Sequence, residues 1–99
     1  MSKRRVVVTG LGIVSPTGIG IEESWKNVLA GQSGITRVTR FDAAPFASQI
    51  AGEVKGFDPS RYMPAKEARR LDTFIHYGMA AAIEAIGDAG ISANEQNAE

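Results

Sequence analysis

Cysteine is absent from the 99-residue sequence, and histidine occurs once, at position 76. Without cysteine the chain can form no disulfide, no thiolate metal site and no cysteine nucleophile. The lone histidine has no visible partner nucleophile, so we interpret His76 as a partly buried or surface residue and not as a catalytic base. Neither residue type therefore supplies a catalytic group within this chain.

The sequence also lacks an excess of charge and a long hydrophobic run. Eleven Lys and Arg residues balance eleven Asp and Glu residues, which argues against general electrostatic binding to nucleic acid or acidic membranes. The apolar run behind the basic start ends at Thr9-Gly10 and is too short for a signal-peptide core or a membrane span. We therefore expect a cytoplasmic protein with no nucleic-acid or membrane partner.

The composition that remains is that of one small globular domain. Hydrophobic residues make up 43% of the chain and charged residues 22%, which is typical of a folded soluble protein. A chain of this length has one core at most.

The β-branched run from Val6 to Val8 predicts a strand covered on both faces, as in the parallel sheets of α/β proteins. Such a strand needs neighbours on both sides. A second short strand is expected over 50–54, where Ile50 and Val54 would share a face. With the helices described next, this order fits an α/β architecture that lacks some of its packing partners.

Two helices stand out in the sequence. Apolar residues at i, i+3 and i+4 predict a short amphipathic helix over 22–30, which Gly31 ends. A longer helix is expected over 72–89, with Gly90 as its C-terminal stop. The apolar stripe of this longer helix consists of Ile75, Met79, Ala82, Ile83 and Ile86. Glycine and alanine fill many of its other positions, so we expect it to pack closely on more than one side.

The turn Gly10-Leu11-Gly12-Ile13-Val14-Ser15 raises the question of a dinucleotide site. That fingerprint needs a third glycine at the sixth position, where the helix should also begin. Here Ser15 and Pro16 follow instead, and the expected helix begins later. Ser15 also lacks the flanking glycines of a nucleophile elbow. A plain strand-to-loop turn is the favoured interpretation.

A basic cluster follows two helix-start signals, Asp58-Pro59 and Pro64. Lys66, Arg69 and Arg70 have the i, i+3, i+4 spacing that places side chains on one face of a helix. Such a face could simply be solvated. It could also dock an acidic protein helix or a phosphate, because the arginine fork makes oriented contacts. The spacing alone leaves both interpretations open.

Several motifs occur together in the order of one known family. They are VVVTGLGIVSPTG at 6–18, GQSGI at 31–35, RFD at 40–42, IAGEVKGFDP at 50–59 and RLDTFIHYGMAAAIEAIGDAGI at 70–91. On these motifs essentially the whole chain resembles the start of the β-ketoacyl-acyl carrier protein synthases, and among them the type II elongating synthases of bacterial fatty acid synthesis.

The resemblance implies a thiolase-like fold of layered α/β/α/β/α architecture, built from two similar halves in a homodimer. Residues 1–99 would then be the N-terminal part of the first half, with no second domain in the chain. The fold class would be α/β, incomplete in this chain. Gly10 and Gly12 would provide backbone conformations or close approaches that a side chain forbids.

The resemblance also implies a reaction without a cofactor. In the family a cysteine takes the acyl chain from its carrier thioester, and decarboxylative Claisen condensation with malonyl-acyl carrier protein lengthens it by two carbons. Two histidines polarise the thioester carbonyl and backbone donors form the oxyanion hole. The cysteine and histidines lie further along a longer chain, and His76 matches none of them. We therefore predict that the 99 residues alone are inactive and poorly stable.

Lys66, Arg69 and Arg70 match the basic segment with which such synthases dock the acidic recognition helix of acyl carrier protein. The resemblance thus favours the docking interpretation, with acyl carrier protein and the remainder of the synthase chain as partners. Two rival functions stay open. One is a stand-alone, non-enzymatic interaction module that uses the same basic face, and the other is a dinucleotide-binding fragment.

Overall fold

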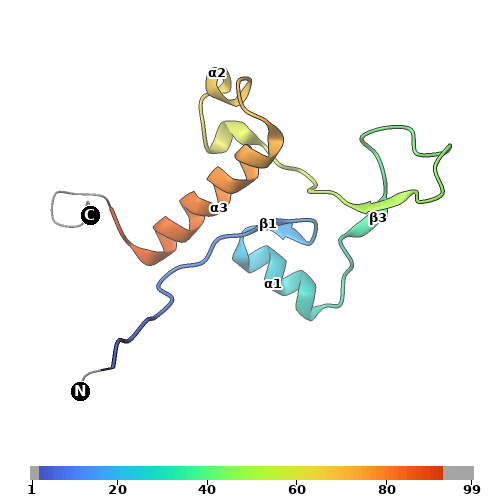
Figure 1. Cartoon of the computed structure of the whole chain (residues 1–99). Coiled ribbons are helices and arrows are strands. Elements are labelled where there is room, and N and C mark those ends of the chain that lie inside the picture. The colour runs from blue at the N-terminus through green and yellow to red at the C-terminus, as the bar shows by residue number, and fades with distance from the viewer. Residues whose placement is uncertain (1–2, 93–99) are drawn as a thin grey trace.

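The computed structural model describes residues 3–92 as two small antiparallel hairpins and a set of helices (Figure 1). The elements are β1 (Val14–Ser15), β2 (Gly18–Ile19), α1 (Ile21–Leu29), β3 (Ile35–Arg37), β4 (Ile50–Gly52), the 3-10 helix η1 (Pro59–Arg61), α2 (Ala65–Ala68) and α3 (Thr73–Ala89). The β1–β2 hairpin and α1 lie beside α3, while η1 and α2 lie at the N-terminal end of α3.

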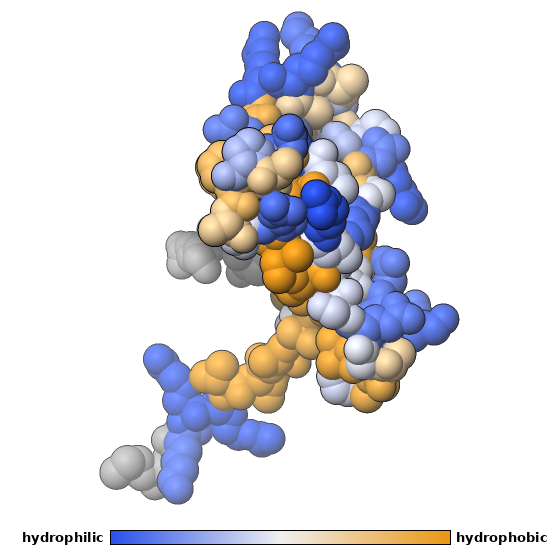
Figure 2. Space-filling model, turned by 90° about the vertical axis from the view of Figure 1, so that its right-hand side faces the viewer, coloured by the Kyte–Doolittle hydropathy of each residue, from blue (hydrophilic) through white to orange (hydrophobic). Residues whose placement is uncertain are grey.

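The described chain is extended and has little core. Its radius of gyration is 17.6 Å, whereas a compact domain of this length has about 13 Å. Among residues 3–92 the buried hydrophobic side chains are those of Ala43, Met63 and Ala80. In Figure 2 the N-terminal segment extends away at the bottom of the molecule, with its hydrophobic residues uncovered. No helix in this part of the chain is long and apolar enough to cross a membrane.

The strand expected over Val6 to Val8 does not form. These residues pair with no strand of residues 3–92, and the exposed fraction is 86% for Val6 and 78% for Val8. The physical reason is that a strand needs a neighbouring backbone to accept and donate its hydrogen bonds, and nothing in the described chain lies alongside. The prediction of a covered strand is therefore wrong for residues 3–92.

Chain pairing begins instead at the Ser15-Pro16-Thr17-Gly18 turn. β1 and β2 pair antiparallel around it, with Val14 opposite Ile19. The Ser15 and Thr17 hydroxyls lie 2.7 Å apart, and the Thr17 N–H donates to Ser15 Oγ at 3.3 Å. Side chains of Ser and Thr stabilise tight turns in this way. The sequence predicts a plain strand-to-loop turn here, and the structure corrects this: within residues 3–92 no strand precedes Val14, and the turn closes the β1–β2 hairpin.

Both predicted helices form within one residue of their expected ends. α1 covers Ile21–Leu29, and α3 covers Thr73–Ala89. Gly90 ends α3 in the left-handed conformation, with φ of 69°, as a glycine stop should. The side on which α3 packs differs from its apolar stripe, however: Ala80 is buried, whereas Ile83 and Ile86 are exposed.

Close approach between the N-terminal segment and α3 depends on two glycines. A Cβ on Gly12 would overlap the carbonyl oxygen of Ala81, and a Cβ on Gly10 would overlap that of Ala85. The segment can therefore lie against the α3 backbone only because both positions lack a side chain. The predicted role of Gly10 and Gly12 in a close approach is confirmed.

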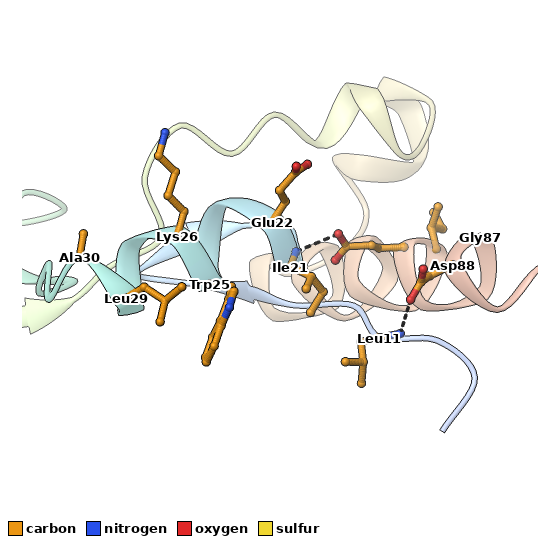
Figure 3. Close-up of a pocket in the computed structure, with 11 residues that line it drawn as sticks. Leu11, Ile21, Glu22, Trp25, Lys26, Leu29, Ala30, Gly87 and Asp88 are labelled. Atoms are coloured by element: carbon orange, nitrogen blue, oxygen red, sulfur yellow. Dashed lines mark hydrogen bonds between the residues drawn. The ribbon is translucent and has the colours of Figure 1, made fainter. Parts of the chain in front are cut away.

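Carboxylates of α3 fix this packing. Glu84 accepts the Ile13 N–H at Oε1 and the Ile21 N–H at Oε2, both at 2.9 Å. Asp88 accepts the Leu11 N–H at 3.1 Å (Figure 3). Ile21 is the first residue of α1, whose N-cap, Gly20, offers no side-chain acceptor. Glu84 therefore supplies a negative acceptor at the N-terminus of α1, where the helix dipole favours one.

The second hairpin is partly as expected. The predicted strand over 50–54 forms over Ile50–Gly52 as β4, and it pairs antiparallel with β3, a strand that the sequence does not predict. Beyond the pair, the Glu53 carboxylate accepts the Thr39 hydroxyl at 2.8 Å and the Thr39 N–H at 3.2 Å. The hydroxyl bond is the main reason that the pKa of Glu53 lies below its usual 4.5.

Candidate functional site

The expected basic cluster follows a capped turn that begins at Asp58. The Asp58 carboxylate accepts the Ser60 hydroxyl at 2.7 Å and the Ser60 N–H at 3.0 Å. These two bonds, the hydroxyl bond first, hold the pKa of Asp58 below its usual 3.8. Pro59 occupies the first position of η1. The helix-start signal predicted from Asp58-Pro59 is therefore confirmed as a short 3-10 turn.

Aromatic rings pack the η1 turn against α3. Phe57 stacks on Tyr62 with ring centroids 5.5 Å apart and meets Tyr77 of α3 edge-on at 5.0 Å. Met63 is 6% exposed and directly precedes Pro64, the N-cap of α2. The start of α2 is thus held by packing on both sides of η1.

Lys66, Arg69 and Arg70 lie together on one short turn of chain, which we call the basic turn. Lys66 belongs to α2, Arg69 is its helical C-cap, and Arg70 lies in the turn that follows. The helix is therefore shorter than the spacing suggests. Helical winding nevertheless continues, because the Arg69 N–H donates to Ala65 O at 3.1 Å and the Arg70 N–H to Glu67 O at 3.0 Å.

The charges of the basic turn face solvent. All three side chains are exposed, and the hydrophilic end of the molecule to which they belong is at the top of Figure 2. Within residues 3–92, Lys66 and Arg70 make no side-chain hydrogen bond or ion pair, while Arg69 Nε donates to Ala65 O at 3.3 Å. The basic turn therefore offers positive charge that no carboxylate of the described chain neutralises.

His76 belongs to α3 and contacts the end of α2, next to the basic turn. Its Nε2 is 2.8 Å from the carbonyl oxygen of Ala68, the last residue of α2. The side chain is half-buried. This contact agrees with the interpretation of His76 as a residue outside any catalytic arrangement.

The segment from Gly10 to Ser15 is unsuited to binding a dinucleotide phosphate. Its Leu11 and Ile13 N–H groups, which would have to bind the phosphate, already donate to Asp88 and Glu84. The two carboxylates would repel an anion there, and α3 fills the space beside Gly12. No group of three or more metal-ligating side chains occurs within residues 3–92 either.

Sequence reasoning missed a groove between α1 and α3, drawn in Figure 3. The groove is open to solvent and has a volume of about 1020 Å³. Its apolar lining includes Leu11, Ile21, Trp25, Leu29 and Ile83. The signal was present as the apolar faces of two predicted helices, but periodicity does not indicate which faces meet.

Comparison with known proteins decides the family. The family model of the β-ketoacyl synthase N-terminal domain matches residues 3–99. The chain belongs to the β-ketoacyl synthase family. The resemblance noted on the sequence motifs is thereby confirmed. The turn at Gly10 and Gly12 is part of this ketoacyl synthase domain, and neither a dinucleotide-binding fragment nor a stand-alone interaction module is favoured.

The curated relatives carry one name. A 3-oxoacyl-acyl-carrier-protein synthase 2 of Vibrio cholerae is 56% identical over 98 residues, which are 99% of this chain and 24% of the relative. The synthase of the same name from Staphylococcus aureus strain COL is 43% identical over 97% of this chain and 23% of its own. This ketoacyl synthase chain therefore spans about a quarter of the length of the curated relatives it matches.

A solved structure agrees with the family. The ishigamide ketosynthase/chain length factor superposes with a TM-score of 0.78 at 38% identity, over 92% of this chain and 23% of that one. The expected fold class, part of a thiolase-like α/β fold, is confirmed by this likeness together with the mixture of helices and strands.

Proposed function

We propose that residues 1–99 are the N-terminal part of the first thiolase-like half of a 3-oxoacyl-acyl-carrier-protein synthase 2. The complete enzyme would elongate fatty acyl chains by decarboxylative Claisen condensation of an acyl thioester with malonyl-acyl carrier protein. The observation that carries this proposal is the 56% identity to a synthase of that name over 98 residues. We also propose that the complete enzyme is a homodimer located in the cytoplasm.

The proposed contribution of this chain is scaffold and docking, since no cysteine is present to carry an acyl group. The remainder of the synthase would supply the nucleophile and the histidines. The exposed apolar residues of the N-terminal segment and of α3 support such a covering partner. Buried against further protein, they would form the core that residues 3–92 lack.

The proposed dock is the basic turn. Exposed Lys66 and Arg70, which have no partner in residues 3–92, support binding of an anionic surface. Acyl carrier protein, with its acidic recognition helix, is the partner that the family resemblance implies. Complementary charge would steer the carrier to the enzyme and fix its register, while the thioester reacts elsewhere. The dock would thus act on substrate capture and leave the chemical step unchanged.

Charge reversal in the complete synthase tests the dock. The double variant Arg69→Glu, Arg70→Glu should raise KM for acyl and malonyl carrier protein roughly tenfold or more, because attraction becomes repulsion. The rate with small acyl and malonyl thioesters, neither of which carries a protein, should stay the same. The effect should shrink as salt is added.

Arg37→Glu is the matched control, because Arg37 is an exposed arginine on β3, outside the basic turn. It should change KM for the carrier proteins by less than the double variant does. An unchanged carrier-protein KM in the double variant would show that the dock is wrongly assigned. Absence of condensing activity in the complete wild-type enzyme would refute the proposed function itself.

A further inference from the structure

The basic turn has a specific contact with α3 that neither its charge nor its spacing explains. The ring nitrogen Nε2 of His76 lies 2.8 Å from the Ala68 carbonyl oxygen. A carbonyl oxygen only accepts, so the imidazole donates its Nε2–H. The neutral Nε2–H tautomer and the doubly protonated ring can both make this bond.

The contact matters because α2 is marginal by itself. The backbone hydrogen bonds of a four-residue helix, Ala65–Ala68, are too few to stabilise it, since helices shorter than about 12 residues are unstable in isolation. The last carbonyls of a helix also lack intrahelical partners. Among the backbone N–H groups of residues 3–92, only that of Leu71 donates to Ala68 O, and at 3.4 Å this bond is long. His76, at 2.8 Å, is the stronger donor.

His76 connects this short helix to a long one. α3 spans 17 residues, and Tyr77, the residue after His76, packs edge-on against Phe57, which precedes η1 in the chain. The start of the η1–α2 segment is therefore held by ring packing, and its end by the His76 hydrogen bond. Arg69 and Arg70 directly follow the carbonyl that His76 holds.

We propose that His76 is a positioning residue for carrier-protein docking, which orients Arg69 and Arg70 by holding the end of α2 on α3. This inference rests on the proposed function of the basic turn. An oriented pair of guanidinium groups binds carboxylates with less loss of side-chain and backbone freedom than a loose pair. His76 would thus act through the two arginines without touching the partner.

The test uses His76→Ala and His76→Gln in the complete synthase. Alanine removes the donor, whereas the glutamine amide reaches a similar distance and can still donate an N–H. His76→Ala should raise KM for carrier-protein substrates roughly three- to tenfold, the effect of losing one hydrogen bond. His76→Gln should restore most of the loss. The rate with small acyl and malonyl thioesters, neither of which carries a protein, should be the same in all three proteins.

Hydrogen exchange gives a readout that needs no carrier protein. The Arg69 and Arg70 amides, bonded to Ala65 O and Glu67 O, should exchange faster in His76→Ala and recover in His76→Gln. The α1 amides serve as the internal control and should not change.

The double charge reversal, combined with His76→Ala, separates the two proposals. If His76 acts through the arginines, His76→Ala should add little to KM in the Arg69→Glu, Arg70→Glu background. An unchanged KM in His76→Ala, or an undiminished increase in that background, would overturn the role of His76 while leaving the dock intact. If the charge reversal itself has no effect, the dock fails, and positioning by His76 fails with it.

Discussion

The Glu84 carboxylate joins three parts of the chain: α3, the segment before the first hairpin and the start of α1. Its two oxygens each accept a backbone N–H, one from Ile13 before the first hairpin and one from Ile21 at the start of α1. Both bonds are part-buried, and neither N–H group has another acceptor within residues 3–92. A part-buried donor left unsatisfied costs more free energy than the bond contributes when made.

Replacing Glu84 in the complete protein should therefore lower stability. We expect Glu84→Ala to reduce the free energy of unfolding by about 2–4 kcal/mol, for two orphaned amides. Glu84→Gln should cost less, because the amide oxygen still accepts one N–H. The measurement is denaturant unfolding, or the shift in Tm where unfolding is irreversible.

Glu22→Ala is the control for Glu84. Glu22 is an exposed carboxylate in the first turn of α1 that accepts no hydrogen bond in residues 3–92. Its removal should change stability by about 0.5 kcal/mol or less. Equal losses for the Glu84 and Glu22 variants would contradict the bridging role of Glu84.

The N-terminal segment packs closely against α3 because Gly10 and Gly12 lie against the backbone of that helix. A Cβ on Gly12 would overlap Ala81 O and lie 2.9 Å from Ala85 N. Both are backbone atoms of a helix, which cannot move away as a flexible side chain can. The N-terminal segment would have to shift, and the Leu11 and Ile13 bonds to α3 would stretch with it.

Gly12→Ala should therefore be severely destabilising, by about 3 kcal/mol or more, the upper range for overpacking. Gly78→Ala is the matched substitution within α3, because a Cβ there has no neighbour within 4 Å in the described chain. We expect it to cost much less, since alanine is the better helix former. Thermal unfolding of both variants in the complete protein checks the difference, and equal costs would show that the contact with α3 is not tight.

The elements that the sequence predicts well are those whose signals are local. α1 and α3 follow from apolar spacing and a glycine stop, and the η1 turn follows from Asp58-Pro59. The strands are predicted poorly, because β1, β2 and β3 have two or three residues each and such lengths show no period. The strand at Val6 to Val8 was expected on propensity, but propensity cannot replace a missing neighbour.

In the candidate site, too, the local pattern could be predicted from the sequence, whereas the tertiary contact could not. Spacing identified Lys66, Arg69 and Arg70 as one cluster, since positions three and four apart lie together on a winding chain. It could not show that α2 ends at Ala68, nor that His76 holds the carbonyl there. That bond spans eight residues and a change of direction between two helices, so it depends on tertiary packing and has no sequence period.

The whole molecule exposes surface that folded proteins ordinarily cover. Val6, Val7 and Val8, Trp25, Phe74 and Ile86 are all more than half exposed. The groove between α1 and α3 adds further apolar surface. With three buried hydrophobic side chains in residues 3–92, hydrophobic burial cannot offset the conformational entropy of ordering the chain.

Residues 1–99 produced alone should therefore lack a cooperative thermal transition as a monomer and should have no condensing activity. Calorimetry and an assay with acyl and malonyl carrier proteins measure the two outcomes, with the complete synthase as the positive control in both. A sharp calorimetric transition from the monomeric segment would mean that this small core suffices, and the exposed valines and α3 face would then need no covering partner. Broad or absent unfolding, together with a cooperative transition in the complete enzyme, would mean that the missing neighbours of Val6 to Val8 come from the remainder of the synthase.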